Sequence, residues 1–448
     1  MNESEKKQDE LEKPALIPAV STVLDDGAIV ETVLRPEEKR TLFVRWNGES
    51  SEYLPAIEAG SSRLVPYSPR NNLLAHEVVL LPSGPEEYGS EAELLSEVRA
   101  FIHRYVDVSP LFEEIASYYV LFTWIYDAFN EVPYLRVRGD YGSGKTRFLQ
   151  TVRSLCYKPI FASGASTVSP IFRILDIFRG TLVIDEGDFR ASDEKAEIVK
   201  ILNNGNARGF PVLRSEATAK KEFDPRAFAV FGPKLIATRS FFEDKALESR
   251  CITEEMGLSR LREDVPINLG DEHKTEALCL RNKLLLFRFR NLKKPHRPDE
   301  AVDRTIEPRL SQIFSPLLSI IEDPEAKKNL LELARKYNRD LVSDRGMDTE
   351  AQVLEVIRDL AEGGNRLTMK EISNLFIDRH GEEFEKKVTP KWVGYMIRRK
   401  LGLKPQKQHG VFVIPLSEEL NLSRLYERYG LTAEEPEPAP PPPPAPLF

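Results

Sequence analysis

The hydrophobic pattern of the chain changes its period several times, and each change predicts a different kind of element. From about residue 27 to 67, short β-type runs such as 41–46 alternate with turn residues, which predicts a small β module. Two helical patterns follow between residues 91 and 130. The second pattern, 111–129, is rich in aromatic residues, and we expect it to pack as core against a sheet.

From residue 134 onward, apolar runs of strand length alternate with helical patterns. The predicted strands are 134–137, 159–162, 181–184 and 234–238, with helical segments such as 170–178 and 193–202 between them. Strands that alternate with helices favour an α/β fold in which a parallel sheet lies between layers of helices.

The last part of the chain is mainly helical. Helical patterns cover 272–289, 307–321 and 324–342. After them, three short helices are predicted, the second opened by a capping box at Thr368 and Glu371 and the third by Thr389 followed by a proline. An apolar strand at 411–414 follows, and three helices with a β-ribbon resemble a winged helix.

A glycine loop stands between the strand 134–137 and the helical segment 146–152. Residues 139–146 fit the pattern G-x-x-x-x-G-K-[ST] in the strand–loop–helix context that this motif requires. Lys145 is expected to reach the β- and γ-phosphates, and the Thr146 hydroxyl is expected to hold Mg²⁺. A chance match is the alternative, which the flanking elements disfavour. The backbone N–H groups that would wrap the phosphates belong to Gly139, Gly142, Ser143 and Gly144.

Two carboxylates end the strand 181–184, and they come 39 residues after Thr146. In parallel sheets, the carboxyl ends of the strands meet at the crevice where ligands bind. Asp185 is therefore predicted to join the Mg²⁺ shell, and Glu186 is predicted to orient and deprotonate the attacking water. The alternative is a strand that runs into an acidic surface turn.

The strand 234–238 ends in polar Thr238, and a Ser-Arg-Cys sequence centred on Arg250 begins eleven residues later. With the glycine loop and the Asp-Glu strand, these residues resemble an AAA+ ATPase over about 134–251, most of all the helicase-like ATPases of phages and mobile elements. The resemblance implies an AAA+ P-loop NTPase with a helical lid at 271–344. It also implies that Thr238 is a first sensor and that Arg250 is an arginine finger on the neighbouring subunit's γ-phosphate.

Two arginine assignments have rivals. Independently of the resemblance, phosphoryl transfer needs a cation at the γ-phosphate, and Arg250 would supply it. The alternative for Arg250 is a surface salt bridge with Glu248 or Glu254. Arg309 is the candidate second sensor on the ATP phosphates, and its rivals are Arg288 and Arg290.

Two regions are candidates for contact with DNA. The runs 210–214 and 228–231 flank a polar insert with Lys220, Lys221 and Arg226, which predicts a hairpin. This hairpin resembles the pre-sensor hairpin that contacts single-stranded DNA in hexameric helicases; a solvated loop is the alternative.

The second region is 386–407, which holds eight basic side chains and no acidic one. Lys391, Tyr395 and Arg398 would form one helical stripe, and Lys404 and Lys407 would lie on the wing. This is the footprint of a phosphate-binding surface. A winged helix used for protein contacts is the alternative.

Length and composition set the limits of this interpretation. With 448 residues the chain is too long for one compact domain. The expected parts are a disordered leader at 1–13, a β-rich module at 14–90, an α/β ATPase core at 91–270, the lid at 271–344, the winged helix at 345–430 and a proline-rich tail at 431–448. The net charge of −8 gives no global basic field, so any nucleic-acid site has to be a local patch.

Three scattered cysteines argue against disulfides and zinc, and no apolar run suggests export or a membrane span, so we expect a cytoplasmic protein. The sequence therefore predicts an ATP- and Mg²⁺-dependent DNA helicase or translocase in the replication of a mobile element or phage. The resemblance implies a homo-oligomeric ring, a hexamer, with single-stranded DNA in its channel and duplex at the winged helix. A DNA-binding loader or remodeller is one alternative. A DNA-binding regulator switched by ATP is the other, and Glu186 speaks against it.

Overall fold

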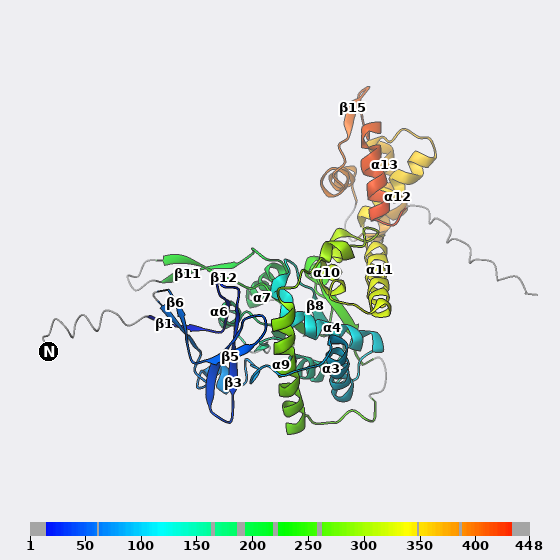
Figure 1. Ribbon diagram of the computed structural model, residues 1–448. Coiled ribbons are helices and arrows are strands. Elements are labelled where there is room, and N and C mark those ends of the chain that lie inside the picture. The colour runs from blue at the N-terminus through cyan, green and yellow to red at the C-terminus, as the bar shows by residue number, and fades with distance from the viewer. Residues whose placement is uncertain are drawn as a thin grey trace, which may run out of the picture. The chain divides into compact units, whose positions relative to one another are not determined.

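The computed structural model describes residues 15–60, 62–162, 166–185, 193–217, 223–257, 262–346, 349–384 and 388–431. The chain divides into two compact units, residues 1–334 and 335–448. Each unit is described by itself below (Figure 1). None of the described helices combines the length and the apolar character that crossing a membrane requires.

The first unit opens with two small β-sheets, as the alternating runs predict. The four-stranded antiparallel sheet contains β2 (Ser21–Val23), β3 (Ile29–Arg35), β4 (Arg40–Trp46) and β5 (Ser51–Leu54). The three-stranded sheet has the order β1 (Ala15–Ala19), β7 (Ser62–Pro66), β6 (Ile57–Ala59). The strands begin at residue 15, whereas the sequence pattern indicates a start near residue 27. The pattern misses β1 because the apolar side chains of this strand are exposed and do not form a core pattern.

Three helices connect these sheets to the next one: α2 (Asn72–Ala75), α3 (Glu91–Tyr105) and α4 (Pro110–Ile125). Ser109 caps α4, with Pro110 at the first helical position. The aromatic side chains of α4 pack as core, as predicted. Tyr119 is fully buried, and its hydroxyl donates to the carbonyls of Pro133 and Lys234, where two central strands begin.

A five-stranded parallel sheet forms the centre of the first unit. Its order is β14 (Cys251–Glu255), β8 (Tyr134–Arg138), β13 (Lys234–Thr238), β10 (Leu182–Ile184), β9 (Ile160–Ala162), and every pairing is parallel. The helices that follow or join these strands are α5 (Lys145–Arg153), α6 (Val168–Phe178), α7 (Asp193–Asn204) and α8 (Lys245–Glu248). This confirms the predicted α/β class with a parallel sheet.

An antiparallel hairpin leaves the sheet between α7 and β13. It consists of β11 (Val212–Ala217) and β12 (Phe223–Phe228), with Val212 opposite Phe228 (Figure 1). A hairpin was expected here, but the prediction of its second strand as 228–231 is wrong. The polar segment 223–227 forms that strand, because a two-stranded ribbon can expose both faces and needs no apolar alternation.

Long helices complete the first unit. They are α9 (Asp271–Asn291) and α10 (Pro308–Leu318), with the 3₁₀ turn η2 (Pro298–Ala301) between them, and α11 (Pro324–Gly346) runs across the boundary between the units. Trp46 of β4 stacks on Phe289 of α9, with ring centroids 5.7 Å apart, so the N-terminal sheet packs against this helix.

The second unit is built from helices and one short hairpin. Its elements are α12 (Thr349–Glu362), α13 (Met369–His380), α14 (Pro390–Tyr395) with a π-helical turn at Met396–Lys400, β15 (Gln406–Gln408), β16 (Val411–Val413) and α15 (Glu419–Arg428). Thr368 and Thr389 cap α13 and α14 as the sequence predicts. Leu354, Phe376 and Ile397 lie in its buried core. The sequence pattern did not predict α15.

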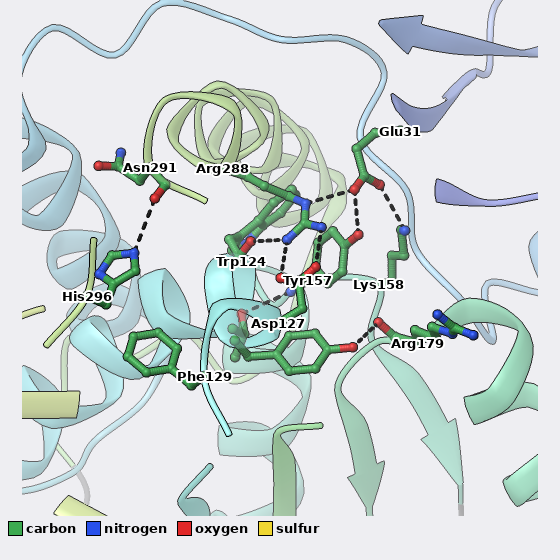
Figure 2. Close-up of polar contacts among 12 residues, drawn as sticks. Glu31, Trp124, Asp127, Phe129, Tyr157, Lys158, Arg179, Arg288, Asn291 and His296 are labelled. Carbon is green, nitrogen blue, oxygen red and sulfur yellow. Dashed lines mark hydrogen bonds and ion pairs between the residues drawn. The ribbon is translucent and has the colours of Figure 1, made fainter. Parts of the chain in front are cut away.

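A buried ionic network joins the N-terminal sheet to the helices of the first unit (Figure 2). The Glu31 side chain on β3 is 1% exposed and lies 2.8 Å from both Lys158 Nζ and Arg288 Nε. It also accepts a hydrogen bond of 2.7 Å from the Tyr157 hydroxyl, and Arg288 bonds both oxygens of Asp127. Burial lowers the pKa of Lys158 to about 8, and the Glu31 carboxylate opposes that shift.

We expect Glu31→Gln to destabilise the first unit strongly. Removing one partner of a buried ion pair typically costs about 3–5 kcal/mol, because the remaining charge is left uncompensated. Lys158 would lose its carboxylate here, and Arg288 would keep only that of Asp127. Urea unfolding followed by tryptophan fluorescence measures the effect. Glu52→Gln is the matched control because that side chain is 63% exposed; equal unfolding midpoints for the two variants would contradict the role of the network.

Candidate nucleotide site

The glycine loop joins the end of β8 to the start of α5, as the motif requires. Gly142 and Gly144 have φ angles of 73° and 91°, which favour glycine, and Gly144 is the N-cap of α5. A Cβ atom on Gly139 would lie 2.5 Å from the Met256 carbonyl oxygen. The loop therefore keeps its backbone close to a neighbouring strand end and directs the N-terminus of α5 outward, which is the arrangement that binds anions.

The Lys145 side chain lies over this loop. Its ammonium group donates to the carbonyl oxygens of Gly139 and Asp140, at 2.6 and 2.7 Å. The positive charge is thus held at the mouth of the loop, where the motif places the β- and γ-phosphates.

The most direct link between the two halves of the site is a hydrogen bond. The Thr146 hydroxyl donates to Asp185 Oδ2 at 3.0 Å, although the two residues are 39 positions apart. Asp185 follows the last residue of β10, and its N–H donates to the Ala162 carbonyl at the end of β9. The fold therefore brings together the hydroxyl and the carboxylate that the sequence predicts as Mg²⁺ ligands.

Thr238 lies between these two groups in the sheet. It is the last residue of β13, and β13 pairs with β8 on one side and with β10 on the other. Its side chain is 1% exposed, and Oγ1 has no hydrogen-bond partner within the described chain. A buried hydroxyl without a partner costs free energy. This orphaned group beside the glycine loop fits a site that receives a polar ligand.

The residues present fit a nucleotide with Mg²⁺. This ion prefers oxygen ligands and usually takes one or two carboxylates together with phosphates and water. Thr146 and Asp185 supply such oxygens. Over the described ranges no group of three or more His, Cys, Asp and Glu side chains could hold a metal.

Arg250 lies at the other end of the sheet. It immediately precedes β14, and its carbonyl accepts from Tyr134 N–H at the start of β8. The five-residue strand β8 spans about 16 Å, so Arg250 is separated by that length from the glycine loop of its own subunit. Its guanidinium donates to the side-chain oxygens of Asn203 and Asn206, each at 2.7 Å, and to the Ala246 carbonyl. Glu248, one of the two suggested salt-bridge partners of Arg250, forms its salt bridge with Arg136 instead.

The three candidates for the second sensor have different surroundings. Arg288 is buried in the Glu31 network, and Arg290 forms an ion pair of 2.7 Å with Glu87. Arg309, at the start of α10, is half-buried. Burial lowers the pKa of Arg250, and the charge of Arg309 lowers it further. The sensor role of Arg309 stays a prediction.

Some predicted residues lie outside the described residues. These are Glu186 and the two hairpin lysines, Lys220 and Lys221. Arg226 is described and lies on β12, where its guanidinium is 4.0 Å from Asp176.

The predicted DNA-contact residues of the second unit share an exposed surface. Lys391, Tyr395, Arg398, Lys404 and Lys407 are all exposed. On the same helix Val393, Met396 and Ile397 are buried, as the predicted periodicity requires. The basic side chains therefore face solvent while the apolar side chains of the helix fill the core.

Sequence reasoning missed the wall of the site that β14 provides. Met256 and Gly257 follow this strand, and Met256 N–H donates to the Arg138 carbonyl at 2.7 Å, just before the glycine loop. It also missed Arg239, whose guanidinium stacks over the Tyr141 ring at 3.8 Å. The only available signal was the position of Arg239, which directly follows the predicted sensor.

Comparisons with known proteins give fold-level likeness at most. No family model matches the sequence, and no curated protein matches it. Among solved structures, the apo C-terminal region of NrS-1 has a TM-score of 0.36 and 11% identity, covering 86% of this chain and 96% of that one. A JCV helicase with a bound acetamide compound has a TM-score of 0.26 and 11% identity, covering 56% of this chain and 62% of that one.

These TM-scores are too low to support a conclusion about function. The geometry of the site is consistent with a P-loop-like fold. A glycine loop, a lysine, a threonine and an aspartate meet at the carboxyl edge of a parallel sheet flanked by helices.

Proposed function

We propose that this chain is an AAA+ ATPase that works as a DNA helicase or translocase. The observation that carries the proposal is the hydrogen bond between Thr146 and Asp185, because it joins the two predicted Mg²⁺ ligands beside Lys145. The glycine loop binds the phosphates through its backbone N–H groups and the N-terminus of α5. Bound Mg²⁺ supplies charge neutralisation at the phosphates.

The protein groups around the nucleotide have separate tasks. Lys145 leaves its carbonyl partners and binds the β- and γ-phosphates. Thr238 donates its hydroxyl, which has no partner among the described residues, to the γ-phosphate or to the attacking water. Glu186 orients and deprotonates that water, in accord with its place after Asp185 in the sequence.

Arg250 is proposed to act in the neighbouring subunit. It lies about one strand length from its own glycine loop, so it cannot serve the nucleotide bound there. A cation on the γ-phosphate is worth about 10³–10⁵ in rate for phosphoryl transfer. A head-to-tail contact that carries Arg250 onto the next subunit's nucleotide generates a ring if its rotation closes, and we propose a hexamer.

DNA is the proposed substrate of the motor. The β11–β12 hairpin would present Lys220 and Lys221 to a single strand in the ring channel, and the second unit would act as a winged helix on duplex. Support for the second role comes from the exposed basic residues of α14 and of the β15–β16 hairpin in a chain of net charge −8. Such a local patch binds phosphates against an unfavourable overall charge.

We expect Lys391→Ala combined with Arg398→Ala to weaken DNA binding. Each lost phosphate contact lowers the slope of log K against log salt by about 1, so the double variant should lose about two units of slope. Fluorescence anisotropy with a labelled duplex across a salt series measures this. The matched control is Lys370→Ala combined with Arg424→Ala, two exposed cations of the same unit. An equal loss of slope in both double variants would show that Lys391 and Arg398 do not form the DNA-binding surface.

Strand displacement separates a helicase from a loader. The helicase proposal expects ATP-dependent unwinding of a forked duplex that is lost in Lys220→Ala combined with Lys221→Ala. DNA-stimulated hydrolysis that persists in this variant, without unwinding in the wild type, would favour a loader that binds through the second unit.

A further inference from the structure

A second cationic cavity lies behind the glycine-loop helix. Its volume is about 430 Å³, and it opens between α5, the loop 267–270 and the first turns of α9. Arg147, Gln150 and Arg153 line it from α5, and Lys274 and Arg281 line it from α9. Arg147 is two residues after Lys145, which places it about 200° around the helix from the lysine of the nucleotide site.

The charge of this cavity is unbalanced. Four cationic side chains line it, Arg147, Arg153, Lys274 and Arg281, against a single carboxylate, Glu77. Glu77 is 3.4 Å from Lys274, and its charge also acts to raise the pKa of Arg153 and of Arg281, so the lining holds one carboxylate for its four cations. Asp271 and Glu272, in the first turn of α9, are exposed and do not line the cavity.

Two buried polar groups in the lining are unsatisfied. Arg281 is 8% exposed; its Nη1 donates to the Ser154 carbonyl at 2.6 Å, but Nε has no partner among the described residues. His273 is 6% exposed, and its Nε2 likewise has none there. Each such group costs free energy while it stays unpaired.

The cations are close enough to affect one another. Burial lowers the pKa of His273 to about 4, and the charges of Arg147, Arg281 and Arg153 contribute in the same direction. Burial also lowers the pKa of Arg281 to about 10; the Glu77 carboxylate opposes that shift and the charge of Arg153 adds to it. At neutral pH the arginines are therefore charged, the imidazole is neutral, and an anion would relieve the repulsion among the guanidinium groups.

The backbone contributes to the same cavity. Gly270 is the N-cap of the 21-residue helix α9 and makes no side-chain cap bond, and a Cβ atom added to it would meet nothing within 4 Å. The first N–H groups of a helix without a capping side chain need acceptors, and the helix dipole favours negative charge there. Arg147 fixes the adjoining loop, because it donates to the carbonyls of Pro266 and Ile267.

We propose that this cavity is a second binding site, for a small phosphate-bearing ligand such as a polyphosphate or the phosphates of a nucleotide. Guanidinium forks bind phosphate oxygens in pairs, and the volume lies within the range of about 300–1,000 Å³ typical of small-molecule sites. Because α5 carries both Thr146 and Arg147, a ligand in this cavity contacts the same helix that holds the catalytic nucleotide. The site itself does not depend on the ATPase proposal.

Titration calorimetry with inorganic tripolyphosphate tests the site in the full chain carrying Lys145→Ala, which weakens binding at the glycine loop. We expect saturable binding with one ligand per chain. Adding Arg153→Gln or Lys274→Gln should each weaken it by about tenfold, since each removes one charge-assisted hydrogen bond to the phosphates. Lys274 is exposed, so its replacement tests the site even if Arg153→Gln fails to fold. Lys283→Gln is the matched control, a lysine of α9 that pairs with Glu97 outside the cavity.

Absence of saturable binding, or equal affinities in the Lys274→Gln and Lys283→Gln proteins, would overturn the proposal. A parallel titration with ATP identifies the source of the phosphates. Tighter binding of ATP than of tripolyphosphate, lowered by the same variants, supports a nucleotide, and equal binding supports recognition of the phosphates alone. Cavity-dependent binding of a single-stranded oligonucleotide, without binding of either small ligand, would overturn the assignment to a small molecule.

Discussion

Asp185→Asn is expected to lower the kcat of ATP hydrolysis by at least about 100-fold, the usual scale for losing one group that stabilises charge in a transition state. The asparagine oxygen can still accept from the Thr146 hydroxyl, which is 3.0 Å from Asp185 in the structure, so the local fold should persist. In the proposed mechanism, the substitution removes the negative charge with which Asp185 would hold Mg²⁺. Steady-state release of phosphate at saturating ATP and Mg²⁺ measures the effect.

Two further measurements make this result specific. Asp299→Asn, at an exposed position in η2, carries the same chemical change and should leave the rate unaltered. The melting temperature of the Asp185→Asn protein should stay close to that of the wild type. A rate within about threefold of the wild type would show that Asp185 does not hold the metal.

Arg250→Ala is expected to lower hydrolysis by about 10³-fold or more, the lower end of the range for an arginine finger. The distinguishing experiment mixes this variant with Lys145→Ala. We expect Lys145→Ala to be inactive because it lacks the cation that binds the β- and γ-phosphates. If Arg250 acts on the neighbour's nucleotide, mixed rings contain interfaces in which an intact Lys145 meets an intact Arg250. Random assembly makes about a quarter of the interfaces complete, so the mixture should recover up to that share of wild-type activity.

The contacts of Arg250 suggest the necessary control. Its guanidinium bonds Asn203 and Asn206 within its own subunit, so a structural role predicts that Asn203→Ala is nearly as harmful as Arg250→Ala. A role in the neighbouring subunit predicts that Asn203→Ala keeps most of the activity. Failure of the mixture to recover, with both variants folded and assembled, would refute the shared site.

Local sequence patterns were sufficient for the centre of the site. The glycine loop, Lys145 and Thr146 lie on one continuous strand–loop–helix segment, so a short motif defines their geometry. Asp185 and Thr238 could be placed beside them because each ends an apolar strand, and the ends of parallel strands share one edge. The helix faces of α14 followed in the same way from an apolar period of 3.6 residues.

The features that sequence reasoning missed have no local pattern. The strand β14 has only two buried residues, Cys251 and Ile252, so its apolar signal is too short to predict an edge strand. In the Glu31 network, partners more than 100 residues apart look like ordinary surface charges until the fold buries them. The cations of the second cavity likewise come from two helices and gather only through their packing.

The steady-state rate of ATP hydrolysis, measured with and without single-stranded DNA, decides whether the protein is a DNA motor. The wild type should be compared with Glu186→Gln, and Lys145→Ala gives the blank. We predict that single-stranded DNA stimulates hydrolysis by the wild type several-fold and that neither Glu186→Gln nor Lys145→Ala hydrolyses ATP. Hydrolysis indifferent to DNA would contradict a DNA motor, and bound ATP without any hydrolysis would leave the nucleotide as an assembly switch.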